Sequence, residues 1–192
     1  MRGHLGSGGE DVHARAAEVL RFWFEESTHQ QRFGKDPAFD DLIRDRFGAL
    51  RDLVLGSGAA EWRDDPGALL AAVVLLDQFS RNIHRGEGQA FAGDPLAQQL
   101  AIEAIDRAWD LAMPEAHRLF LYMPLEHAED GPLQALSIER MATLEDAECL
   151  RYAREHAEVI ARFGRFPSRN AALGRVSTPE EVAYLEQPGV GW

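Results

Sequence analysis

The segment from Ala68 to Leu76 is an unbroken apolar run, and it constrains the fold more than any other part of the chain. The Asp65-Pro66 pair just before it is a helix-start signal, and the run is rich in Ala and Leu, which favour helices. A helix that is apolar on every side must be surrounded by other elements. The run stops at Asp77, far short of the ~20 residues that cross a bilayer. We therefore expect a central buried helix in a protein with no membrane partner.

The rest of the chain also favours helices. Ala, Leu, Glu and Arg dominate, Ile, Val and Thr are sparse, and no alternating strand pattern of convincing length is present. Helix starts are marked by an Asp or Thr before a Pro, at Asp36, Asp65, Asp94 and Thr178. The first side chain caps free backbone N–H groups, and Pro suits the first helical position. The predicted helices span 11–26, 37–55, 66–84, 95–112, 114–129, 132–146, 146–163 and 179–187.

Short connections between the predicted helices, such as 86–93 and 131–132, allow neighbouring helices to be antiparallel. The sequence therefore predicts an all-α fold of stacked antiparallel helical hairpins, in one layer or as a short superhelix. No linker divides the chain, so we expect residues 11–192 to form a single domain. Residues 1–10 are rich in Gly, and we expect a flexible N-terminal segment there.

The charge balance and the cysteine content exclude several classes of protein. Twenty Lys and Arg residues against 32 Asp and Glu residues give a net charge of −12, which repels a phosphate backbone, so nucleic acid is not an expected partner. The single cysteine, Cys149, excludes an internal disulfide framework. The start of the chain has no apolar signal core, and we expect a cytoplasmic protein. No motif for a phosphate loop, a dinucleotide or a serine nucleophile is present, and the sequence leaves the cofactor unknown.

Polar side chains follow the central apolar run directly. If the helix continues, residues three and four apart share a face, which places Asp77, Arg81 and either His84 or Arg85 at the mouth of the core. Gln78 and Asn82 add neutral hydrogen-bond donors. The guanidinium group matches the geometry of an oxyanion, so this segment is a candidate anion site. The alternative is a helix pair of Asp77 with Arg81 and an Arg85 that complements the helix C-terminus, with no ligand.

A second polar segment follows Pro124. Proline cannot donate a hydrogen bond to the preceding turn, so we expect the helix to kink or restart there. Glu126, His127 and Glu129 offer carboxylates and an imidazole, which serve as metal ligands or acid–base groups. The alternative is that the acids stabilise a new helix start through its dipole. No His-Glu-x-x-His spacing and no second cysteine are present, so we assign no metal ligands.

A third candidate is His156. Cys149, Ala153, His156 and Ile160 fall on one helical stripe, which places an imidazole on an otherwise apolar face. The imidazole is either a core histidine with satisfied hydrogen bonds or an acid–base group whose titration is moved by burial.

The segment beyond this helix is basic. Gly164 predicts the helix end, after which Arg165 and Arg169 are able to reach other parts of the molecule. The stretch 151–175 holds six Arg and two Glu, a local charge of +4 in a chain of −12. It is either a place of anion capture or a basic patch that complements acidic helices elsewhere in the molecule.

The chain carries a specific combination of segments in a fixed order: Phe22-Trp23-Phe24, Leu76 to Asn82, Phe120 to His127, His156, and Arg162 to Glu181. This combination resembles the bacterial family known as domain of unknown function 924, over about residues 12–187. The resemblance implies an all-α fold like that of tetratricopeptide-repeat proteins. It implies no established activity.

The resemblance also marks polar positions, most of which are singled out above. In three places the chain departs from the family pattern, since Ser80, Ala128 and Ser168 stand where the family commonly shows Pro, Ser and His. Ser80 permits an unbroken helix, whereas Ala128 lacks the hydroxyl and Ser168 lacks the ring nitrogen that the family commonly has at these positions. The motif residues carried onto this chain are Asp77, Gln78, Arg81, Asn82, Glu126, His127, His156, Arg162, Arg165 and Asn170.

The leading hypothesis is one polar pocket for a small anionic ligand, formed where the three polar segments converge. Arg81, Arg162 and Arg165 would neutralise the anion, the amides would orient it, and Asp77 would hold Arg81. The predicted ligand-binding residues are Asp77, Gln78, Arg81, Asn82, Arg85, Arg162, Arg165 and Asn170.

Three alternatives stay open. One is an enzyme in which Glu126, His127 and His156 are the catalytic acid–base groups, with or without a metal ion. Another is a helical module that binds a protein or peptide on a concave face. The last is a buried polar network that only ties helices together. The sequence does not indicate the oligomeric state.

Overall fold

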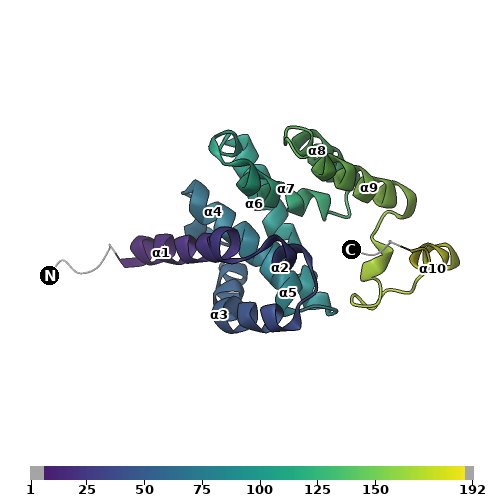
Figure 1. Cartoon of the computed structure of the whole chain (residues 1–192), viewed down its shortest axis with the longest axis horizontal. Helices are drawn as coiled ribbons and strands as arrows, with labels where there is room; N and C mark the ends of the chain where they lie inside the picture. Colours follow the sequence, from purple (N-terminus) through teal and green to yellow (C-terminus); the bar gives the residue numbers. More distant parts are fainter. Residues whose placement is uncertain (1–6, 189–192) are drawn as a thin grey trace.

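The computed structural model describes residues 7–188, and every regular element within that range is helical (Figure 1). The all-α prediction is therefore confirmed. The α-helices are α1 (Ser7–Arg21), α2 (His29–Phe33), α3 (Pro37–Gly56), α4 (Pro66–Val73), α5 (Ser80–Ile83), α6 (Asp94–Asp106), α7 (Glu115–Glu126), α8 (Gly131–Met141), α9 (Ala147–Phe163) and α10 (Pro179–Leu185).

The expected central helix is present as a continuous rod formed by α4, η3 (Val74–Phe79) and α5. All side chains from Ala68 to Leu76 are buried. They are buried because α1, α6 and α7 pack against α4, and α3 packs against η3 and α5. The polar residues at the end of the rod are thereby carried into the interior. Within residues 7–188, no helix combines the length and the apolar composition that a membrane span requires.

The middle of the rod departs from α-helical geometry. The segment η3 is π-helical, a form in which an N–H group bonds the carbonyl five residues earlier. The Ser80 hydroxyl likewise donates to the Leu75 carbonyl, at 3.3 Å. The sequence predicts a helix over 66–84 but gives no sign of this wider turn. The turn lies where the apolar run gives way to Asp77 and Gln78, and π-helical segments are frequent at functional sites.

Three of the helix-start signals are confirmed. The carboxylate of Asp36 accepts hydrogen bonds from the first turn of α3, and that of Asp65 accepts one from the first turn of α4. Thr178 forms a capping box with Glu181 at the start of α10. The assignment of Asp94 as a cap is wrong, because Gly93 holds the cap position of α6 without a side-chain bond. The Asp94 carboxylate binds arginines instead.

The expectation for Pro124 is also corrected. Helix α7 does not restart at Pro124 but passes through it and ends at Glu126. A proline so close to a helix end removes one hydrogen bond from the last turn only, so the helix tolerates it. The next helix, α8, begins after Asp130, whose carboxylate caps it.

Other boundaries differ by a few residues. Helix α1 begins at Ser7, so the last part of the predicted flexible segment 1–10 is helical, while residues 1–6 lie outside the described residues. The short helix α2 is not predicted, and the helix predicted over 95–112 ends at Asp106. Beyond that end, Ala108 has a left-handed φ of 55°, which turns the chain away.

Helices α6 to α9 pack against one another in chain order, and Figure 1 shows α8 lying beside α9. This order agrees with the predicted stacking of hairpins. A small second core lies next to α10, where Phe163 and Tyr184 pack on Val159, Ile160 and Phe166. This core anchors the segment after α9 close to the polar end of the rod.

Candidate functional site

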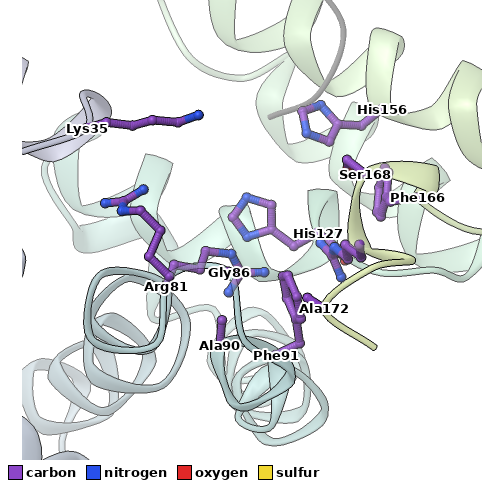
Figure 2. Close-up of a pocket in the computed structure, with 12 residues that line it drawn as sticks. Lys35, Arg81, Gly86, Ala90, Phe91, His127, His156, Phe166, Ser168 and Ala172 are labelled. Carbon is purple, nitrogen blue, oxygen red and sulfur yellow. The ribbon is translucent and has the colours of Figure 1, made fainter. Parts of the chain in front are cut away.

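A cavity of about 420 Å³ lies at the polar end of the rod (Figure 2). Figure 2 shows the rings of His127 and His156 facing the same space, with Lys35 reaching toward it from the opposite side. The cavity is lined by Lys35, Arg81, Arg85, Gly86, Ala90, Phe91, His127, His156, Phe166, Ser168, Arg169 and Ala172.

Asp77 and His127 form a buried carboxylate–imidazole pair. Nδ1 of His127 lies 2.8 Å and 3.1 Å from the two carboxylate oxygens of Asp77. An ionised carboxylate only accepts hydrogen bonds, so Nδ1 carries the proton and Nε2 has a free lone pair. Burial by itself raises the pKa of Asp77, but the charge of Arg81 and the hydrogen bonds from His127 and Gln78 hold it well below its usual range. Burial also lowers the pKa of His127, so the ring is neutral at pH 7.

Arg81 joins Asp77 to Asp94. Its Nη1 lies 2.9 Å from Asp77 Oδ1 and also donates to the Asp77 carbonyl at 2.9 Å. Its Nη1 and Nη2 together bind both oxygens of Asp94, at 2.9 Å and 3.0 Å. Burial opposes the charge on Arg81, but the two carboxylates raise the pKa of the group overall. This two-point geometry fixes the plane of the guanidinium at the cavity wall.

Arg169 comes from the segment after α9 and meets the same carboxylate. Its Nη1 lies 3.2 Å from Asp94 Oδ2, and its Nη2 donates to the His127 carbonyl at 2.9 Å. The guanidinium carbon is 4.6 Å from the ring centres of both Phe91 and Phe166, so the cation lies between two aromatic rings. Burial, with the nearby charge of Arg81, lowers the pKa of Arg169 to about 10, so it is still a cation at pH 7.

His156 and Glu126 form a second pair, in which His156 lines the cavity and Glu126 lies behind it. Nδ1 of His156 lies 2.9 Å from the Tyr152 carbonyl and 3.5 Å from Glu126 Oε1. Burial lowers the pKa of His156 to about 3, and the positive charges of nearby groups add to this effect. Burial raises the pKa of Glu126 to about 8, helped by the negative charge of Asp77. At pH 7 the imidazole is therefore neutral and the carboxyl is protonated, and of the two only His156 lines the cavity.

The other predicted residues of the rod hold this arrangement in place. Gln78 donates to Asp77 Oδ2 at 2.6 Å and does not line the cavity. Arg85 binds both oxygens of Asp40, at 2.7 Å and 2.8 Å, and lines the cavity. Asn82 donates to the same carboxylate at 2.7 Å, outside the cavity lining. The structure thus brings five predicted residues of 77–85 to one place, with different roles.

The structure contradicts the expected meeting of Arg81, Arg162 and Arg165 at a shared cavity. Arg162 donates to Glu180 at 2.8 Å, and Arg165 binds both oxygens of Glu181 at 2.6 Å and 2.8 Å. These acids lie in the first turn of α10, where the helix dipole favours them.

Asn170 also lies away from the cavity lining. Its side-chain amide donates to Ser177 Oγ at 3.0 Å and to Glu181 at 3.2 Å, and its oxygen accepts from Arg175 at 2.9 Å. The prediction of direct ligand contact for Asn170 is therefore not supported, and the residue fastens the segment after α9 to α10.

Several residues at the site are not predicted from the sequence, among them Asp94, Arg169, Phe91 and Lys35. Asp94 follows the same Asp-Pro pattern as true helix caps, and nothing in the sequence separates it from them. Arg169 belongs to the basic stretch, but so do five other arginines. Phe91 has no polar signal. Lys35 is the only lysine of the chain, but composition alone assigns it no role.

Metal binding has no support from the geometry. Among residues 7–188, no group of three or more His, Cys, Asp and Glu side chains is arranged to hold a metal ion. His127, Asp77 and Arg81 lie close together, but a guanidinium beside the imidazole competes with a cation for the carboxylate.

A solved structure and a protein-family model both match this chain over most of its length. A solved structure of ATU0120, a protein of unknown function from Agrobacterium tumefaciens, is 40% identical to this chain. The match covers 92% of this chain and 99% of that chain, with a TM-score of 0.86. No curated protein matches. The model of a family of bacterial proteins of unknown function, DUF924, matches residues 19–189. Because this match spans most of the sequence, the chain belongs to the DUF924 family.

Proposed function

We propose that the cavity binds a small anionic ligand. The observation that carries this proposal is the make-up of the cavity wall. It contains Lys35, Arg81, Arg85 and Arg169 but, among the described residues, no Asp or Glu, although the chain as a whole is strongly acidic. A cavity lined by one sign of charge concentrates ligands of the opposite sign.

The carboxylates near the cavity lie behind the arginines and orient them. Three of them, Asp40, Asp77 and Asp94, hold the guanidiniums of Arg81, Arg85 and Arg169 from the protein side. With neutral imidazoles, the four cationic side chains exceed the three carboxylates by one charge. The cavity side therefore keeps a positive potential and oriented N–H donors, which is the arrangement that an anion requires.

Arg81 and Arg169 provide a more local argument. Both bind Asp94, so two cations lie next to each other with one carboxylate between them. Their repulsion contributes to the lowered pKa of Arg169. An anion bound at the open side of the pair would relieve this repulsion, because an opposite charge stabilises both cations.

The size of the cavity fits a small metabolite rather than a polymer. Its volume of about 420 Å³ lies within the range of ~300–1,000 Å³ that small-molecule sites occupy. The apolar residues Ala90, Phe91, Phe166 and Ala172 also line it. These side chains would contact the carbon skeleton of a ligand whose anionic group meets the arginines.

The test is the thermal stability of the protein in inorganic phosphate and in pyrophosphate. A ligand at 100 times its Kd stabilises a protein by about 2.7 kcal/mol, which raises the Tm of a chain of this size by roughly 5–10 °C. Arg169→Gln should lose at least about 1.4 kcal/mol of this stabilisation, a tenfold loss of affinity. Asp94 keeps Arg81 as a partner in this variant, so the fold should persist.

The matched control is Arg162→Gln, which removes the same charge at an exposed position outside the cavity. It should respond to both anions as the wild type does. Equal responses of the two variants, or no response of the wild type, would refute anion binding at this cavity.

A further inference from the structure

We infer that the cavity is a hydrolytic site for phosphate monoesters, in which His127 is the general base and Asp77 is its positioning residue. This inference rests on the proposed anion binding and adds a reaction to it. It starts from a geometric fact: the imidazole that lines the cationic cavity is hydrogen-bonded through Nδ1 to a buried carboxylate.

The rod fixes Asp77 firmly. Its side chain is 1% exposed and is held by Arg81 and by Gln78 as well as by His127. A carboxylate held in this way selects the tautomer of the imidazole with the proton on Nδ1. The lone pair of Nε2 is then available to a group in the cavity. Arg169 adds to the rigidity of this arrangement, because it binds the backbone carbonyl of His127.

His127 is a better general base than its neighbour His156, although both rings line the cavity. The Nδ1 partner of His127 is an ionised carboxylate, which stabilises the imidazolium that forms when Nε2 accepts a proton. His156 lies 3.5 Å from Glu126, whose carboxyl is protonated at pH 7 and offers no such charge. With a pKa of about 3, His156 is also too weak a base near neutral pH.

The arginines favour a phosphoryl group over a carboxylate. Arg81 and Arg169 lie side by side, and Lys35 and Arg85 line the same cavity. A phosphate monoester carries up to two charges on three non-bridging oxygens, so it can engage several of these cations at once. A carboxylate offers one charge and two oxygens.

The reaction balances with water as the only co-reactant. A water oxygen attacks phosphorus while Nε2 of His127 takes a proton from that water. The ester P–O bond breaks, and the leaving oxygen takes up a proton from the imidazolium or from solvent, which gives an alcohol and inorganic phosphate. Arg81 and Arg169 stabilise the charge on the phosphoryl oxygens in the transition state.

The experiment measures phosphate release from p-nitrophenyl phosphate, glucose 6-phosphate and adenosine monophosphate. His127→Gln should lower kcat by about 10²–10⁴-fold, the usual contribution of a general base. Its affinity for inorganic phosphate, measured by calorimetry, should stay close to that of the wild type. The matched control is His84→Gln, since His84 follows the same rod and does not line the cavity. That control should keep full activity.

Asp77→Asn tests the positioning role. Its kcat should fall with little change of KM, and the acidic limb of the pH–rate profile should move, since that limb reports the ionisation of His127. The charged and titratable groups around this ring are Asp77, Arg81, Glu126, His156 and Arg169. If Asp77→Asn does not fold, the kcat of His127→Gln alone tests the hydrolytic role of the site.

The outcomes separate this inference from the proposed function. Phosphate binding without release from any of the three esters refutes the hydrolytic role and leaves anion binding intact. Release that His127→Gln does not reduce also refutes it. If the wild-type protein does not bind phosphate, the proposed function and this inference are both refuted.

Discussion

Two arginine clusters are similar in composition and opposite in arrangement. The cavity cluster consists of Arg81, Arg169, Asp77, Asp94 and His127, and the tail cluster consists of Arg162, Arg165, Arg175, Glu129, Glu180 and Glu181. In the tail cluster each guanidinium has a carboxylate of its own. In the cavity cluster Arg81 and Arg169 share Asp94.

The difference shows that two guanidiniums sharing one carboxylate indicate an anion site better than the number of arginines does. The stretch 151–175 has a local charge of +4 in the sequence, but Glu129, which follows α7, and Glu180 and Glu181 of α10 neutralise three of its six arginines. The cavity cluster has fewer arginines and keeps an open cationic side. Four predictions test this contrast.

The largest expected effect is that of Asp94→Asn. It removes the shared carboxylate and leaves two mostly buried guanidiniums without it, which should cost about 3–5 kcal/mol of unfolding free energy in urea denaturation. Phosphate should restore part of this loss. In the tail cluster, Glu180→Gln breaks an exposed pair and should cost ~0–1 kcal/mol. If both variants lose the same stability, the contrast between the clusters is wrong.

Two glutamates near the end of α7 allow a sharper test, because their pKa values move in opposite directions. Burial raises the pKa of Glu126 to about 8, so this residue favours the folded state below pH 4.5 and loses that contribution as the pH rises through 8. Burial also acts on Glu129, but Arg175 and the Phe166 N–H group lower its pKa overall. Its contribution is present above pH 4.5 and is lost as the pH falls.

Glu126→Gln should therefore gain stability relative to the wild type as the pH rises from 5 to 9, on the order of a few kcal/mol. Glu129→Gln should be less stable than the wild type at pH 7, and the difference should shrink below pH 4. Denaturation curves across this pH range measure both. Parallel pH profiles for the two variants would contradict the assigned environments.

Gly93→Ala should have a moderate effect. A Cβ at Gly93 would lie 2.6 Å from the backbone oxygen of Leu76, so the start of α6 must move away from the rod. We expect a loss of ~1–3 kcal/mol and a weaker phosphate affinity, because Asp94 follows directly. The control is Gly48→Ala in α3, where the nearest atom is 3.9 Å away. Helix propensity predicts a gain of ~0.5–1 kcal/mol there, so a loss at both positions would contradict the explanation.

The smallest effect is expected for Lys35→Gln. Lys35 lines the cavity and forms no ion pair among the described residues, so its loss should not disturb the fold. Phosphate affinity should fall by about 1.4- to fivefold, which corresponds to the ~0.2–1 kcal/mol of a solvent-accessible charge. High salt should reduce this difference. Arg154→Gln, on the exposed side of α9, should leave the affinity unchanged.

Much of the fold follows from local sequence signals. Asp36, Asp65 and Thr178 mark true helix starts, because capping depends on residues only two or three positions away. The unbroken run from Ala68 to Leu76 identifies the central element, since a helix that is apolar on all sides is stable only in the interior of the protein. Signals of this kind do not need knowledge of the tertiary structure.

The site is less predictable because its contacts join distant residues. Asp77 and His127 were both selected from the sequence, but their pairing spans 50 positions and no spacing rule indicates it. Asp94 has the pattern of a cap and a different role. Arg165 was assigned to the ligand, whereas the capping box of α10 brings Glu181 to it. In each case the sequence shows the chemical type of the residue but does not show which distant residue it pairs with.

The wide turn at Val74–Phe79 has a consequence for how this family can vary. A single residue added to a helix rotates everything beyond it by about 100°. Deleting one residue from this turn would turn Arg81 away from Asp94 while the apolar part of α4 stayed in place. Insertions and deletions in this short segment would therefore abolish or create the cavity without changing the surrounding helices, and length variation there among homologues would mark members that have lost the site.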